Sequence, residues 1–398
     1  MSHAHGLRQT LVRKPSNVST AMSVQGCLHR LLQFLSFHIA KIFGCTQMSS
    51  GSLVVNTAGV ELAYIDSGAP PHASSYTTIF AVHGMIYTNQ TFQKVLNVAP
   101  SQGVRFVAIQ RRPFPGSTPF TAEELNVILT GGSSEAERDA QMAARGHEMA
   151  SFVDTFIQKF KLPPLSDDGK TGGVALLGWS EGGAFPIAAI ASSDTLPAHV
   201  QARLSSYVRS LIVYESAPPV LGFPTPTQNW APLNDTTMPK NLRLPAFGQW
   251  STGYFDHGDI TLSSAHNLDS LSWVLSSPER VPTFYNIPVD QLKTITTYGN
   301  DALTDVPFLH FFSYQLQAVY SKVFNDTNIA AKFPHMKKSC LCGDKTGAFA
   351  VAGLWAVQDD QKENGTDANV SFKLIHGANR FLIWDDPEKA FHAFMDLV

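Results

Sequence analysis

The sequence predicts an α/β protein with a mainly parallel central sheet and an inserted, mostly helical lid. Short apolar runs alternate with helical patterns before residue 217 and after residue 336, and this alternation is typical of a parallel sheet flanked by helices. Residues 218–335 interrupt the alternation with a segment rich in proline and aromatic side chains. The third observation is a strand–turn–helix pattern at residues 172–183, in which glycines surround Ser180.

The first two strands are predicted to form an antiparallel hairpin. Residues 53–56 and 60–65 alternate around Ala58-Gly59, which is typical of a hairpin turn. Six further runs are short and apolar, and turn residues bound them, as expected of buried strands. We predict these strands, in chain order, at residues 77–82, 104–109, 174–177, 210–214, 338–342 and 370–375.

Helices are predicted between these strands. The longest runs from about residue 134 to residue 160, because Ser134 and Glu137 form a capping-box pattern at its start and Pro163-Pro164 stops it. Its apolar residues recur at helical spacing from Met149 onwards. A small-residue helix follows Ser180, and the remaining helices are predicted at residues 92–98, 349–358 and 388–397.

The composition indicates a globular protein and excludes some classes of partner. Apolar residues make up 44% and charged residues 15%, and the formal net charge is −3. Nothing in the overall charge therefore favours nucleic acid, and we expect a small-molecule partner. The four cysteines, Cys27, Cys45, Cys340 and Cys342, match neither a disulfide framework nor a zinc-binding spacing. We expect no metal and no cofactor.

The first 47 residues differ from the rest of the chain. Residues 1–60 contain no aspartate or glutamate, and apolar side chains recur at helical spacing within residues 27–44. A basic, amphipathic leader of this kind is typical of a mitochondrial transit peptide or of a helix in peripheral contact with a membrane. The alternative is an extension of the gene model, since Met48 is a natural start. We expect an intracellular protein, cytoplasmic first and mitochondrial second.

The segment around Ser180 has the pattern of a nucleophile elbow. A short apolar strand leads into Gly178-Trp-Ser-Glu-Gly182, and a helix follows. The flanking Gly178 and Gly182 fit a turn that is too tight for larger side chains. In such a turn the serine hydroxyl rises above the sheet edge. The backbone N–H of Glu181 then points to where an oxyanion would form.

Three further segments resemble the α/β-hydrolase family. Residues 80–85, Phe-Ala-Val-His-Gly-Met, resemble the loop that supplies a second oxyanion donor, so the resemblance implies that role for the backbone N–H of Met85. Residues 109–117 resemble the strand and turn of members with a lid, and residues 377–388 resemble the segment with the catalytic histidine. The resemblance, which is to fungal lidded hydrolases, implies a core of residues 48–217 and 336–398 and a lid at residues 218–335.

The first departure from the family concerns the catalytic base. Arg380 stands where the family has its histidine. A guanidinium stays protonated and cannot accept the proton of a serine hydroxyl, although it can bind an anionic substrate. His376, four residues earlier, is the candidate substitute base. We expect His83, in the oxyanion loop, to be structural.

The second departure concerns the catalytic acid. Thr346 occupies the position at which the resemblance places an aspartate. Two alternatives remain open, Asp344 nearby and Glu215 at the end of the strand at residues 210–214. Some lidded members, such as certain haloalkane dehalogenases, place the acid at the second position, and we favour Glu215. The side chain of Glu181 is expected to be structural, because an acid in the first turn of a helix is favoured by the helix dipole.

Two functions follow from these residues. The first is a serine hydrolase of the carboxylesterase type that acts on a small-to-medium apolar ester, weakened because Arg380 replaces the histidine. A serine nucleophile argues against epoxide hydrolase and dehalogenase chemistry, which uses aspartate in this fold. The alternative is a catalytically inactive, hydrolase-fold protein that binds a ligand, with Arg380 favouring an anion.

Overall fold

The computed structural model describes residues 48–366 and 369–398, and the leader predicted at residues 1–47 lies outside this range. The described residues form an eight-stranded sheet in the order β1-β2-β4-β3-β5-β6-β7-β8. The strands are β1 (Ser49–Val54), β2 (Glu61–Asp66), β3 (Thr77–Val82), β4 (Val104–Ile109), β5 (Val174–Trp179), β6 (Val208–Tyr214), β7 (Lys337–Gly343) and β8 (Val370–Ile375).

Strand direction divides the sheet into two parts. β1 pairs with β2, and β2 with β4, in antiparallel directions, whereas every other neighbouring pair is parallel. Strands β3, β4, β5 and β6 are buried along their whole length, as expected of parallel strands that helices cover on both faces. This order and these directions are those of the α/β-hydrolase fold, so the predicted fold class is confirmed.

Helices cover both faces of the sheet and enclose two apolar cores. On one face the long helix α4 packs on α5, and the apolar sides of α6, α10 and α12 join the same core. The helices of this layer are α4 (Glu135–Phe160), α5 (Ala184–Ala191), α6 (Ala198–Tyr207), α10 (Ser313–Phe324) and α12 (Ala348–Glu363). On the other face lie α2 (Gln93–Val98), α13 (Leu382–Asp385) and α14 (Pro387–Met395).

Among the described residues outside 218–335, the helices α3, α6 and the short α13 are absent from the sequence-based prediction. The first, α3 (Ala122–Leu129), begins with a capping box in which Thr121 and Glu124 bond each other's backbone N–H, and this signal is visible in the sequence. The second, α6, buries only Val200 and Leu204, so its apolar stripe is too narrow to stand out.

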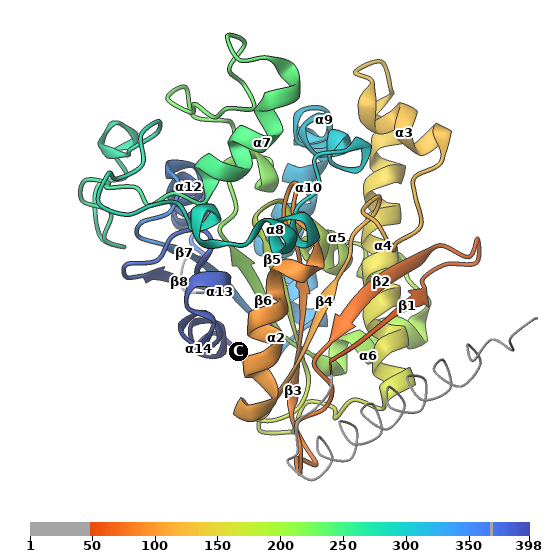
Figure 1. Ribbon diagram of the computed structural model, residues 1–398. Helices are drawn as coiled ribbons and strands as arrows, with labels where there is room; N and C mark the ends of the chain where they lie inside the picture. The colour runs from red at the N-terminus through yellow and green to blue at the C-terminus, as the bar shows by residue number, and fades with distance from the viewer. Residues whose placement is uncertain (1–47, 367–368) are drawn as a thin grey trace, which may run out of the picture. The chain divides into compact units, whose positions relative to one another are not determined.

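An inserted helical region lies between β6 and β7. Figure 1 shows its helices α7 and α9 near the top of the view and α8 below them, near the centre. Its helices are α7 (Lys240–Ser251), α8 (Val289–Ile295), α9 (Asp305–Phe311), α10 and α11 (Thr327–Lys332). Side-chain contacts bind it to the sheet domain: Tyr254 and Thr283 each donate to Asp385 at 2.5 Å. No helix among the described residues is long and apolar enough to cross a membrane.

Parallel strands bring the candidate residues to one edge of the sheet. β3, β5 and β6 are adjacent and parallel, so the residues that follow Val82, Trp179 and Tyr214 emerge side by side. Ligands in open α/β sheets bind at this carboxyl edge. Ser180 and Glu215 are the first residues after β5 and β6, so the sheet alone places them near each other.

Candidate active site

Ser180 lies in a strained turn between β5 and α5. Its φ angle is +59°, in the left-handed region that non-glycine residues seldom occupy, and it opens the 3₁₀ turn η3 (Ser180–Gly183). A β-carbon at Gly182 would lie 2.3 Å from the Val82 carbonyl oxygen, and one at Gly178 would lie 2.3 Å from the Cα of Gly183. Both positions therefore require glycine, and the turn has the geometry of a nucleophile elbow.

The loop after β3 packs directly on this turn. A β-carbon at Gly84 would lie 2.9 Å from the Cβ of Ser180, so the loop backbone reaches the serine only because this residue is glycine. The next residue, Met85, lines the same cavity as Ser180 and Glu181. The Met85 N–H donates no hydrogen bond to any other part of the described chain. It is therefore available to an oxyanion or to a ligand oxygen.

Arg380, which stands where the family resemblance places a histidine, contacts the serine directly. Its Nη2 donates to Ser180 Oγ at 2.5 Å, and its Nη1 donates to the Glu215 backbone oxygen at 3.4 Å. Only 1% of the residue is exposed, and its guanidinium lies 5.0 Å from the Trp179 ring centre and 5.1 Å from that of Phe349. Burial lowers the pKa of this guanidinium from its ordinary value.

The Arg380 guanidinium has no carboxylate partner among residues 48–366 and 369–398. Every ion pair within 4.0 Å in the described chain joins other residues, and Arg380 Nε has no hydrogen-bond acceptor. Buried arginines are normally paired, because an isolated charge is expensive to remove from water. The site therefore contains a buried positive charge for which the described residues supply no close counter-ion.

Glu215 is an acid whose backbone oxygen contacts this arginine. It is fully buried, with φ +57°, and its carboxyl oxygens accept hydrogen bonds from the Gly343 N–H at 2.7 Å and from the Thr346 hydroxyl. Burial raises its pKa to about 7, although these hydrogen bonds and the charge of Arg380 oppose the shift. The carboxyl of Glu215 thus reaches the loop after β7, where the resemblance expects an aspartate at position 346.

His376 and Asp344 pair with each other at the surface. His376 Nδ1 lies 2.7 Å from Asp344 Oδ2, and 96% of the histidine side chain is exposed. Asp344 also accepts the Gly377 N–H at 2.6 Å. Among the described residues, Ser180 Oγ has Arg380 as its hydrogen-bond partner and not His376. The structure therefore does not bring the candidate substitute base, or its neighbouring acid, to the serine.

His83 is buried and held by the backbone. Its Nδ1 donates to the Gly84 oxygen at 3.0 Å, and its Nε2 accepts the Arg111 N–H at 3.2 Å. Complete burial lowers its pKa well below the ordinary value, so the ring is neutral. Both ring nitrogens are occupied, and the contacts are those of a residue that shapes the loop after β3.

A buried ionic group joins Glu181 to the lid. Arg111 Nη2 lies 3.0 Å from Glu181 Oε2, and Arg111 Nη1 lies 2.9 Å from Asp305 Oδ1. Asp305 Oδ2 accepts the Ile86 N–H at 3.1 Å, beside Met85. Burial raises the pKa of Glu181 to about 8 and also raises that of Asp305. The Arg111–Asp305 pair holds the loop after β3, and sequence reasoning missed it because the two residues lie in distant segments.

Ser180 and Arg380 line a cavity of about 600 Å³. Its volume is typical of a site for a small organic ligand. Most of its lining is apolar, and within the described chain Arg380, Glu181 and His310 are the lining residues with ionisable side chains. The apolar lining residues include Ala217, Pro218, Val220, Phe247, Leu309 and Phe349.

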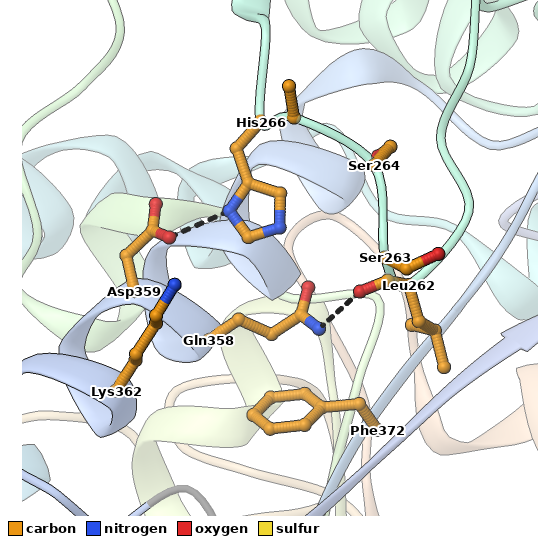
Figure 2. A pocket seen from close by; sticks show the side chains of 9 residues that line it. Leu262, Ser263, Ser264, His266, Gln358, Asp359, Lys362 and Phe372 are labelled. Atoms are coloured by element: carbon orange, nitrogen blue, oxygen red, sulfur yellow. Dashed lines mark hydrogen bonds and ion pairs between the residues drawn. The ribbon is translucent and has the colours of Figure 1, made fainter.

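Figure 2 shows another cavity, of about 470 Å³, lined by residues 262–266, α12 and Phe372 of β8. There His266 Nδ1 lies 2.8 Å from an Asp359 oxygen, and Gln358 donates to the Leu262 carbonyl at 3.3 Å. The Asp359 side chain is 57% exposed, so water weakens the pair. None of the sequence-predicted site residues lines this cavity, and we place the candidate site at Ser180.

Metal ligands do not cluster in the described chain. No group of three or more histidine, cysteine, aspartate or glutamate side chains there has the arrangement of a metal site.

Solved structures resemble the chain at low sequence identity, whereas no family model and no curated protein matches it. A potato epoxide hydrolase variant is 11% identical, with a TM-score of 0.48 over 87% of this chain and 98% of that one. A bromoperoxidase from Bacillus anthracis is 14% identical, with a TM-score of 0.47 over 88% and 99%. A carboxylesterase of the thaumarchaeon Nitrososphaera gargenis is 12% identical, with a TM-score of 0.46 over 87% and 97%. These likenesses concern the fold alone, and the strand order together with the serine elbow identifies the described residues as an α/β-hydrolase fold.

Proposed function

We propose that this protein uses an α/β-hydrolase fold to bind a small anionic ligand, and that it does not turn over esters at the rate of a complete triad. One observation carries the proposal. The buried Arg380 guanidinium donates to Ser180 Oγ at 2.5 Å, in the place where a hydrolase needs a base. A permanently protonated group cannot take the serine proton.

The neighbouring carboxyls do not replace the missing base. Glu215 uses its two oxygens for Gly343 and Thr346, and Glu181 is paired with Arg111 at 3.0 Å. Neither carboxyl has a hydrogen bond to Ser180. Proton transfer needs a hydrogen-bonded contact between the base and the nucleophile, so Ser180 lacks an activated state.

The charge of the site favours an anion. A bound carboxylate would give Arg380 the counter-ion that the described residues do not provide, and the surrounding apolar walls would strengthen that attraction by excluding water. Arginine also matches the planar geometry of a carboxylate better than lysine does.

Calorimetric titration with octanoate and with its neutral analogue octanamide tests this proposal. We expect the wild-type protein to bind octanoate at least about tenfold more tightly than octanamide, because only octanoate compensates the charge. Arg380→Met should remove the preference. Arg138→Met, which alters an arginine on α4 away from the cavity lining, is the matched control and should retain it. A preference that survives in Arg380→Met, or is missing from the wild type, contradicts the proposal.

A weakened carboxylesterase for a small-to-medium apolar ester is the second candidate. The φ angle of +59° at Ser180 and the unused Met85 N–H favour it, because both features suit an acyl-transfer site. Sites that lack a triad member still retain about 10³–10⁴-fold catalysis over water. Hydrolysis of p-nitrophenyl butyrate by the wild type and by Ser180→Ala distinguishes the candidates. Turnover above that residual level that is lost in Ser180→Ala would favour the carboxylesterase over the anion-binding protein.

A further inference from the structure

The donors of the proposed site belong to residues that line one cavity, namely Arg380, Ser180 and Met85. Arg380 Nη2 lies 2.5 Å from Ser180 Oγ, and a β-carbon at Gly84 would lie 3.4 Å from the same nitrogen. The backbone between Gly84 and Met85 therefore runs against both the guanidinium and the serine. A carboxylate between them would contact the guanidinium with one oxygen, and the Met85 N–H with the other.

From this arrangement we infer that the ligand is a monocarboxylic acid with an apolar body, held with its carboxylate against Arg380, Ser180 and the Met85 N–H. The inference rests on the proposed function, since it names the class of anion. The carboxylate would take the position that the acid product of an ester hydrolase occupies next to its serine.

The charges around the cavity favour one negative charge over two. Arg380 is the one lysine or arginine among the described residues that line it, and two carboxyls, Glu181 and Glu215, lie nearby. A phosphate monoester would bring a second negative charge to a buried site with a single cation. That charge would remain without a partner, and an uncompensated buried charge disfavours binding.

The walls favour an apolar body of several carbons. Phe247, Leu309 and Phe349 line the cavity of about 600 Å³, together with the small residues Ala217 and Pro218. Each buried CH₂ group strengthens binding by about fourfold. An acid as short as acetate would leave these walls in contact with water, so affinity should rise with chain length.

A calorimetric series of acetate, butanoate, octanoate, octanamide and octyl phosphate tests the inference. We expect octanoate to bind more tightly than butanoate and acetate, and at least about tenfold more tightly than octyl phosphate. Ser180→Ala should weaken the affinity for octanoate several-fold, because the variant lacks the serine hydroxyl. Arg380→Lys keeps the positive charge, so it should still bind octanoate more tightly than octanamide. This second variant keeps the test valid if Arg380→Met fails to fold.

The outcomes separate this inference from the proposed function. Octyl phosphate binding as tightly as octanoate, with both dependent on Arg380, overturns the monocarboxylate class and leaves anion binding intact. If the affinity does not increase from acetate to octanoate, the inference that the ligand has an apolar body is wrong. If no anion in the series shows binding that depends on Arg380, both the inference and the proposed function are wrong.

Discussion

Arg380→His should convert the binding site into an active esterase. The guanidinium now extends between Ser180 Oγ, at 2.5 Å, and the Glu215 backbone oxygen, at 3.4 Å. An imidazole on the same backbone would lie between the serine and the buried acid at the end of β6. That order of nucleophile, base and acid is the order that acyl transfer requires.

The size of the gain follows from the state of Glu215. Loss of the histidine from a working triad reduces turnover by about 10⁶-fold. We expect only about 10²–10³ of this to return, because the loops around position 380 are packed on arginine. Burial raises the pKa of Glu215 to about 7 while Arg380 is present, and Arg380→His removes a charge that opposes this shift, so the carboxyl of the variant ionises only at and above neutral pH. The gain should therefore increase several-fold from pH 6 to pH 8.

Hydrolysis of p-nitrophenyl butyrate measures this gain. Ser180→Ala in the same background should abolish it, and Glu215→Gln should abolish its rise between pH 6 and pH 8. A folded Arg380→His protein with no gain would refute the geometric reasoning. So would a gain that persists in the Ser180→Ala background.

Three further results are expected. Arg380→Met should raise the free energy of unfolding by about 1–4 kcal/mol in urea titrations, because it removes an unpaired buried charge; a destabilised variant would contradict this. The pKa of Glu215 is about 7 in the folded state against an ordinary 4.5, so the folded chain keeps a proton that the unfolded chain loses. Its contribution to stability is then fully present below pH 4.5 and falls by about 3 kcal/mol as the pH rises to 7, a loss that Glu215→Gln should remove. His376→Ala should change neither octanoate affinity nor stability by more than about 0.5 kcal/mol, since 96% of its side chain is exposed.

The elbow and the sheet could be predicted because their signals are local. The turn requires glycine at the two positions that flank Ser180, so the spacing in the sequence reflects the steric requirement directly. A β-carbon at Gly178 or Gly182 would lie 2.3 Å from a backbone atom. The capping box of α4 at Ser134 and Glu137 forms as the sequence indicates, with both reciprocal bonds present. Residues within a few positions of one another suffice to specify such features.

The polar contacts of the site could be predicted only in part. Asp305 accepts the Ile86 N–H across 219 residues of sequence, and nothing near Asp305 marks it as a partner of the loop after β3. His376 and Asp344 look like a base and an acid in the sequence, but their loops turn this pair to the surface. The direction of a loop side chain depends on tertiary packing, which short-range patterns do not contain.

Fluorophosphonate labelling of Ser180 tests most directly whether Arg380 has replaced the catalytic base. Wild type and Arg380→His would be compared at pH 8 by intact mass, with Ser180→Ala as the background. We expect Arg380→His to be labelled at least about 10²-fold faster than the wild type, whose serine has no proton acceptor. Labelling of wild-type Ser180 as fast as that of Arg380→His would show that another base activates it, and would contradict the assignment of this site to ligand binding.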